Sequence, residues 1–184
     1  MKPWRRVSSS TLVSDRWLTL RADECELPNG ARLNPYYVLE ESEWVHVFAV
    51  GSDQRVLTVT QFRYAGGAVC MELPGGVVDP GESPLEAARR ELREETGFSA
   101  SVWAQVASPF ANPARQTNRV HVFLAEELDA GGAQSLDLAE AIEHQFSSPA
   151  EVASHIASGL FGQALHIASF YLCQEWLRAR AAAR

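Results

Sequence analysis

The sequence predicts an α/β (α+β) fold in which a mixed β-sheet is packed between helices. Strand-like segments occur on both sides of one short helix with strong capping signals, and a long helical stretch closes the chain. The 184 residues are 46% hydrophobic and 21% charged, which is close to the composition of an average globular protein. This length is enough for one domain with a small appendage.

The first 45 residues predict short strands and turns. Residues 17–21 and 36–39 are strand-like, and Pro28-Asn29-Gly30 between them is typical of a hairpin turn. A second strand pair is expected at 44–50 and 56–64, around a turn at 51–53. Three further strands are expected at 69–73, 102–107 and 120–126.

The central helix is expected to begin after Ser83 and to end before Gly97. Ser83 and Glu86 form the two halves of a capping box, and Pro84 suits the first turn. Gly97 stands where a left-handed residue ends a helix. An apolar stripe predicts the buried face of this helix, formed by Leu85, Ala88 and Leu92.

The C-terminal third predicts a flexible linker and two helices. Residues 130–133 are the linker, Ser148 begins one helix, and 163–183 form a long final helix. The apolar stripe of the final helix fits packing on its own core better than binding to a membrane or a partner. Its arginines lie near the C-terminus, where the helix dipole favours positive charge.

Composition limits the classes of partner. The formal net charge is −7, so we expect no non-specific binding to nucleic acid. Cys25, Cys70 and Cys173 are widely spaced and odd in number, which favours reduced thiols in a cytoplasmic protein. We see no signal-peptide pattern and no apolar stretch near the roughly 20 residues that cross a bilayer, so we expect no membrane association.

Three carboxylates share one side of the central helix. At 100° per residue, Glu95 lies about 40° from Glu91, and Glu94 lies about 60° in the other direction. Like charges at this spacing destabilise a helix by roughly 0.2–0.5 kcal/mol per pair, so a compensating cation is expected. Hard oxygen ligands suit Mg²⁺ or Mn²⁺. Taken alone, the Glu-x-x-Glu-Glu pattern fits a solvated acidic face at least as well.

The surrounding residues resemble a known family. Gly76-x5-Glu82-x7-Arg90-Glu91-Leu92-x-Glu94-Glu95-x-Gly97-Phe98 matches all nine specified positions of the Nudix box. The resemblance implies a Nudix-type α/β/α sandwich at 46–184, preceded by a small β region at 1–45. It also implies hydrolysis of a nucleoside diphosphate linked to another moiety, with a divalent metal.

The same resemblance assigns roles to residues of the box. Glu91, Glu94 and Glu95 are the metal-binding candidates, and the backbone carbonyl of Gly75 is a further candidate ligand. Arg90 is a candidate catalytic residue that pairs with Glu82 to orient the loop and the helix. A plain structural salt bridge between Arg90 and Glu82 is an equally good interpretation.

The segment Gln61-Phe62-Arg63 is similar to one in ADP-ribose-cleaving Nudix enzymes, which makes Arg63 a candidate phosphate ligand. A solvent-facing strand-end arginine is the alternative. Arg115 and Gln116 lie on a polar loop and are weaker substrate-binding candidates. Pro113, fifteen residues after Phe98, is similar to the proline of the ADP-ribose pyrophosphatase subgroup.

The general base is expected outside the box, on a loop in the C-terminal third. Glu140 and Glu143, within residues 138–144, are the candidates. Glu140 is favoured, because it lies closer to the glycine linker and leaves Ile142 to start a strand. Each of these two glutamates alone also fits an exposed surface carboxylate.

The expected substrate is ADP-ribose or a related nucleoside diphosphate sugar. Dinucleoside polyphosphates, NADH and other nucleotides are the alternatives within the family, and an ADP-ribose-sensing module is a further one. Related pyrophosphatases pair through an N-terminal strand region, so a homodimer is expected. Trp4, Trp17 and Trp44 fit base stacking or an interface, although core packing is the better expectation for each.

Overall fold

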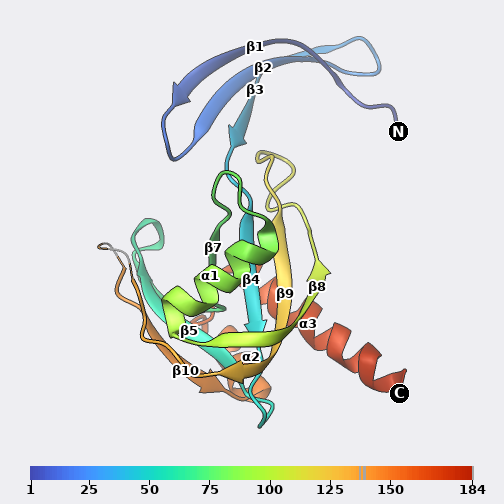
Figure 1. Cartoon of the computed structure of the whole chain (residues 1–184). Coiled ribbons are helices and arrows are strands. Elements are labelled where there is room, and N and C mark those ends of the chain that lie inside the picture. Colours follow the sequence, from blue (N-terminus) through green and yellow to red (C-terminus); the bar gives the residue numbers. More distant parts are fainter. Residues whose placement is uncertain (137, 139, 184) are drawn as a thin grey trace. The chain divides into compact units, whose positions relative to one another are not determined.

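The chain folds as two compact units in the computed structural model, which describes residues 1–136, 138 and 140–183 (Figure 1). One unit combines Met1–Glu43 with Phe110–Arg119, and the other combines Trp44–Pro109 with the chain from Val120 onward. Residue 139, inside the segment expected to carry the general base, lies outside the described residues. The expected boundary between 45 and 46 stays a prediction.

The first unit is built on a three-stranded antiparallel sheet in the order β1-β2-β3. Its strands are β1 (Arg5–Ser14), β2 (Thr19–Glu26) and β3 (Arg32–Glu40). The hairpin expected around Asn29-Gly30 is confirmed, since β2 pairs with β3 and Gly30 is left-handed, with φ 83°. Strand β1 was not expected. It is exposed along nearly its whole length, so its sequence lacks the apolar alternation that identifies a half-buried strand.

Tryptophans of the first unit lie at its surface. Trp4 is 50% exposed and meets Tyr36 edge to face, with ring centroids 5.9 Å apart. Trp17 is 73% exposed, and the guanidinium of Arg16 lies over its ring. The expectation of core packing is therefore wrong for Trp4 and Trp17.

The second unit contains two sheets. The four-stranded sheet has the order β7-β4-β9-β8, and the three-stranded sheet has the order β10-β5-β6. Strands β4 and β9 run parallel, whereas all other neighbours are antiparallel, so the larger sheet is mixed as expected. The strands are β4 (Trp44–Ala49), β5 (Val56–Arg63), β6 (Ala68–Glu72), β7 (Gly75–Val77), β8 (Ser99–Ala107), β9 (Val120–Asp129) and β10 (Glu143–Ser147).

The expected pairing of residues 44–50 with 56–64 is wrong. Strands β4 and β5 belong to different sheets and share one isolated bridge, between Val50 and Val56. Strand β4 is buried on both faces after Trp44, which is the environment of a central strand covered by helices. A short turn in the sequence suggested a hairpin, but burial of β4 on both faces places it between β7 and β9 instead.

Helices cover both faces of the four-stranded sheet, which confirms the expected α/β/α sandwich (Figure 1). The helices are α1 (Pro84–Thr96), α2 (Pro149–Ser158) and α3 (Ala164–Ala182). Ala88 and Leu92 of α1 share a buried cluster with Val45 and Val47 of β4. The alternate residue Phe48 packs on Phe170 of α3, with ring centroids 5.7 Å apart. Because neighbouring side chains of a strand point to opposite faces, α1 and α3 lie on opposite sides of β4.

The capping signals place the helix ends as expected. Ser83 and Glu86 form both bonds of the capping box of α1, and Gly97 ends this helix at φ 74°. Ser148 and Glu151 form the same box at α2. The side chain of Gln163 accepts from the first backbone N–H groups of α3. Sequence signals at helix ends were therefore reliable in this chain.

The cysteines and the hydrophobicity of the helices were also part of the sequence predictions, and the structure describes both. The three cysteines are free, with Cys25 and Cys173 buried. Within the described residues, no helix combines the length and the apolar character needed to cross a membrane.

Two buried histidines stack between β4 and α3. The ring centroids of His46 and His166 are 3.7 Å apart, and His46 Nδ1 lies 2.9 Å from Ser169 Oγ. The backbone N–H of Leu73 donates to His166 Nδ1 at 3.2 Å. Burial and the charge of Arg63 lower the pKa of His166 to about 3. Burial, followed by the charges of His166 and Arg63, lowers the pKa of His46 well below its usual value. Both rings are therefore neutral near pH 7.

This pair makes the stability of the fold depend on pH. An unfolded histidine takes up a proton near pH 6.5, but His166 in the fold does not, so stability is full above that pH and is lost as pH falls. Between about pH 7.5 and pH 5, the wild type should lose about 2 kcal/mol more unfolding free energy than His166→Asn. Urea unfolding at several pH values measures this difference. If the unfolding free energies of the two proteins change equally with pH, the prediction is contradicted.

Candidate active site

A glycine pair brings the backbone of β7 against β4 and α1. Residues Gly75–Val77 form a short edge strand paired with β4. A Cβ atom on Gly75 would lie 2.1 Å from the carbonyl oxygen of Val45, and one on Gly76 would lie 2.2 Å from Glu91 Oε1. Glycine at both positions is therefore what lets this strand approach the acidic side of the helix.

Glu95 is the most deeply buried carboxylate of the helix, at 4% exposure. The backbone N–H of Gly75 donates to its Oε2 at 2.9 Å. Burial, which opposes ionisation, raises the pKa of Glu95 well above its usual value, and the charges of Glu91 and Glu140 add to this effect. The fold thus holds an acidic group where its negative charge is poorly solvated.

Arg90 links the other two carboxylates of the helix to the preceding loop. Its Nη1 donates to Glu91 Oε1 at 2.9 Å and to Glu94 Oε2 at 3.1 Å. Its Nε and Nη2 donate to the two oxygens of Glu82 at 3.1 and 3.0 Å, and Nη2 also donates to the carbonyl of Val77 at 2.9 Å. These bonds raise the pKa of Arg90 and keep it charged. The expected pairing of Arg90 with Glu82 is present.

The charge of Glu140, on the loop before β10, acts on the glutamates of α1. Burial raises the pKa of Glu91, and the charges of Glu94 and Glu140 raise it further. Glu140 has the same effect on Glu95. We call the three carboxylates of α1 the carboxylate cluster (Glu91, Glu94 and Glu95), and the charge of Glu140 acts on two of them.

The second candidate base lies in a different setting. Glu143 is the exposed first residue of β10, opposite Thr60 of β5. The strand begins one residue later than the expected start at Ile142, and Ile142 itself is buried. Of the two candidates, Glu140 is the one whose charge reaches the buried glutamates of α1.

The donor set of the carboxylate cluster fits a divalent cation of the hard class. Carboxylate oxygens are the ligands that Mg²⁺ and Mn²⁺ prefer, and here they are concentrated beside the two glycines of strand β7. Among the described residues, no three His, Cys, Asp or Glu side chains already stand in a metal-holding arrangement. Arg90 bonds one oxygen of Glu91 and one of Glu94, so the second oxygen of each carboxylate is not engaged by Arg90.

Arg63 forms an ion pair with the buried carboxylate of Glu72. Its Nε and Nη2 donate to the carboxylate of Glu72 at 3.1 and 2.5 Å, while its own side chain is 45% exposed. Arg63 is therefore an exposed strand-end arginine, as the alternative has it, that is also paired with a buried carboxylate. The charge of Glu95 also acts on Arg63, which places the guanidinium within electrostatic reach of the carboxylate cluster.

Glu72 is a residue of this region that sequence reasoning missed. It ends strand β6 and has no exposed surface. The available signal was a charged residue at the end of the apolar strand Val69–Met71, because a carboxylate in such a position needs a buried partner.

Arg115 and Gln116 belong to the first unit. The N–H of Leu39 donates to the carbonyl of Arg115 at 2.7 Å, and Gln116 Nε2 donates to Glu41 at 2.8 Å. The loop that carries them is thus attached to the end of β3. Their expected role in binding substrate stays a prediction.

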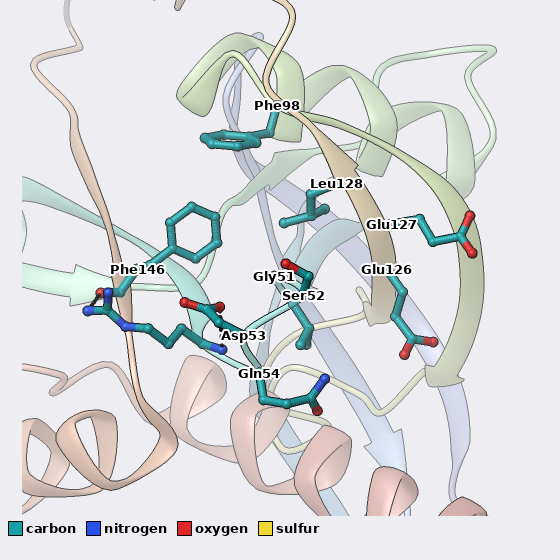
Figure 2. A pocket seen from close by; sticks show the side chains of 11 residues that line it. Gly51, Ser52, Asp53, Gln54, Phe98, Glu126, Glu127, Leu128 and Phe146 are labelled. Atoms are coloured by element: carbon teal, nitrogen blue, oxygen red, sulfur yellow. Dashed lines mark hydrogen bonds between the residues drawn. The ribbon is translucent and has the colours of Figure 1, made fainter.

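A cavity of about 520 Å³ lies elsewhere in the second unit (Figure 2). The β4–β5 turn lines one side of it, and Phe98, Leu128 and Phe146 provide apolar wall. None of the residues that line it belongs to the carboxylate cluster. The volume of this cavity therefore does not identify the active site. We locate the candidate active site by the chemistry of its side chains instead.

Family models match both parts of the chain. The model of the NUDIX domain matches residues 43–164. The model of the nucleoside diphosphate sugar hydrolase N-terminal domain matches residues 4–39.

Curated relatives carry related names. The ADP-ribose pyrophosphatase of Bacillus subtilis (strain 168) is 32% identical over 124 residues, which is 67% of this chain and 66% of the relative. The ADP-ribose pyrophosphatase of Mycobacterium tuberculosis is 34% identical over 66% of this chain and 59% of the relative. The chain thus spans less than two thirds of the length of these two relatives. The ADP compounds hydrolase NudE of Escherichia coli (strain K12) is 26% identical over 92% of this chain and 91% of the relative.

A solved structure supports the fold over nearly the whole chain. The crystal structure of an ADP compounds hydrolase superposes with a TM-score of 0.84, covers 98% of this chain and 97% of its own, and is 22% identical. Together with the match of the NUDIX model to most of the second unit, these comparisons show that the chain belongs to the Nudix family.

Proposed function

We propose that this protein hydrolyses the diphosphate bond of ADP-ribose or a related nucleoside diphosphate sugar, giving a nucleoside monophosphate and a sugar phosphate. The carboxylate cluster on α1 is the observation that carries this proposal. Buried like charges raise one another's pKa and call for a cation, and a cation beside a diphosphate is the basis of this chemistry. The names of the relatives and the N-terminal domain model support the substrate class.

We propose Mg²⁺ or Mn²⁺ as the cofactor. Glu91, Glu94 and Glu95 would hold it, with the carbonyl of Gly75 as a further ligand. When bound, such an ion neutralises phosphoryl oxygens and lowers the pKa of water. The chain's own contribution is to concentrate hard oxygen ligands and to hold Arg90 close enough to balance part of their charge.

The remaining candidate residues act as the general base and bind the substrate. Glu140 accepts the proton of the attacking water, and the effect of its charge on Glu91 and Glu95 supports this role. Arg63 binds a phosphate oxygen, since its planar fork makes paired, charge-assisted bonds. Arg115 and Gln116 contact other parts of the substrate.

A second candidate is hydrolysis of other ADP compounds, including dinucleotides. The relative NudE covers the chain at 92% and is named for ADP compounds in general rather than for ADP-ribose. The intact set of box carboxylates argues against a sensing module without catalytic activity.

We also propose a homodimer in the cytoplasm. Exposed apolar side chains on and beside β1, including Leu12, Val13 and Trp17, support an interface in the first unit. The free cysteines support a reducing compartment.

The substrate is tested with a panel of nucleotides and Mg²⁺, in which mass spectrometry identifies the products. We expect AMP and ribose 5-phosphate from ADP-ribose, and no turnover in excess chelator, because the carboxylates alone supply no positive charge. Full turnover in chelator would refute the role of the metal. Preferential cleavage of a dinucleotide would favour the second candidate.

The base is tested by substituting each of the two candidate glutamates. Glu140→Gln should lower kcat by about 10²–10⁴-fold, because loss of a general base typically has this effect, while metal affinity changes little. Glu143→Gln should change kcat less than about threefold, because surface substitutions away from a site have small effects. Steady-state kinetics and metal titration measure both, and the reverse ranking would reassign the base.

A further inference from the structure

A fully buried carboxylate stands behind the proposed phosphate ligand. Glu72, the last residue of β6, has no exposed side-chain surface. Removing such a charge from water is costly, and replacing a buried ion pair with apolar groups is often neutral or stabilising. Fold stability alone is therefore a poor reason to retain Glu72 at this position.

The pairing with Glu72 fixes one edge of Arg63 and leaves the other available. Nε and Nη2 of Arg63 both bond Glu72. Among the described residues no acceptor bonds Nη1, and the side chain is 45% exposed. The charge of Glu95 acts on this guanidinium, so Arg63 lies within electrostatic reach of the carboxylate cluster. A rigid fork presented in this way can accept a phosphate without first losing its orientational freedom.

His166 supports Glu72 from the C-terminal helix. Its Nδ1 accepts the N–H of Leu73 at 3.2 Å, so the neutral ring carries its proton on Nε2. That Nε2 lies 3.6 Å from Glu72 Oε2, so the ring contacts the carboxylate without a direct hydrogen bond. The ring of His46 stacks on His166 at 3.7 Å and limits its rotation. The carboxylate of Glu72 is thus bonded by Arg63 and contacted by a ring of α3.

We propose that Glu72 and His166 are positioning residues for the diphosphate, acting through Arg63, so that the C-terminal helix α3 helps to set the geometry of phosphate binding. The inference rests on the proposed function, because it needs a phosphorylated substrate at Arg63. It adds to that function two residues outside the Nudix box that touch no substrate themselves.

A double-mutant cycle tests this dependence. Glu72→Gln and Arg63→Gln should each lower kcat/KM for ADP-ribose by about 10–100-fold, the cost of a misplaced binding group. The double variant should be no worse than Arg63→Gln alone, because Glu72 acts only through that arginine. If the two single-variant losses of kcat/KM multiply in the double variant, the proposal is overturned. An unchanged kcat/KM in folded Glu72→Gln would also overturn it.

Two substitutions of His166 provide a second test that leaves the ion pair in place. Gln at this position can return an N–H donor near the Nε2 site, whereas Asn can replace the acceptor at Nδ1 but leaves Glu72 without that donor. We expect the larger loss of kcat/KM in His166→Asn, and we expect both losses to vanish in an Arg63→Gln background. Equal activity in both variants, or the opposite ranking, would contradict a positioning role.

A matched control separates activity from stability. Glu126→Gln weakens another Arg–Glu pair, in which Arg180 of α3 donates to both oxygens of Glu126 at 2.5 and 2.6 Å. It should lower the urea midpoint while leaving kcat/KM unchanged.

If Glu72→Gln does not fold, the two His166 variants and Arg63→Lys decide the question. If the wild type cleaves another nucleoside diphosphate instead of ADP-ribose, the same cycle applies to it, whereas an inert wild type refutes the proposed function itself.

Discussion

The repulsion between closely spaced carboxylates on one side of α1 is the constraint on which the rest of the site depends. Burial makes it stronger, because the pKa values of Glu91 and Glu95 rise where water is excluded. Arg90 offsets part of this repulsion by bonding Glu91, Glu94 and the loop residue Glu82 at once. The remaining negative charge is available for a cation.

The layers around the helix hold this arrangement in place. The alanines and Leu92 of α1 pack on β4, so the helix cannot turn its acidic side away from the glycine strand β7. On the opposite face of the sheet, α3 brings His166 to Glu72, and Glu72 in turn holds Arg63. Helix α1 thus supplies the negative charge that a cation requires, and strand β5 of the other sheet supplies the positive charge that a diphosphate requires.

Local signals predicted the helix and its carboxylates well. Ser83, Glu86 and Gly97 act within a few residues of one another, so their effect can be read from the sequence. The division of strands between two sheets was not predictable, because burial of β4 on both faces depends on helices far away in the chain. The same holds for Glu72 and His166, which are 94 positions apart and meet only in the folded structure. Glu140 was chosen by resemblance, and its electrostatic contact with α1 likewise depends on the fold.

The central claim is that the carboxylate cluster is a divalent cation site, and Mn²⁺ binding followed by electron paramagnetic resonance tests it most directly. The wild type should bind Mn²⁺ in a saturable manner. Glu95→Gln should weaken that binding at least tenfold, because it removes the most buried negative ligand, whereas Glu143→Gln should leave it unchanged. Equal Mn²⁺ affinity in the wild type and in Glu95→Gln would contradict the account.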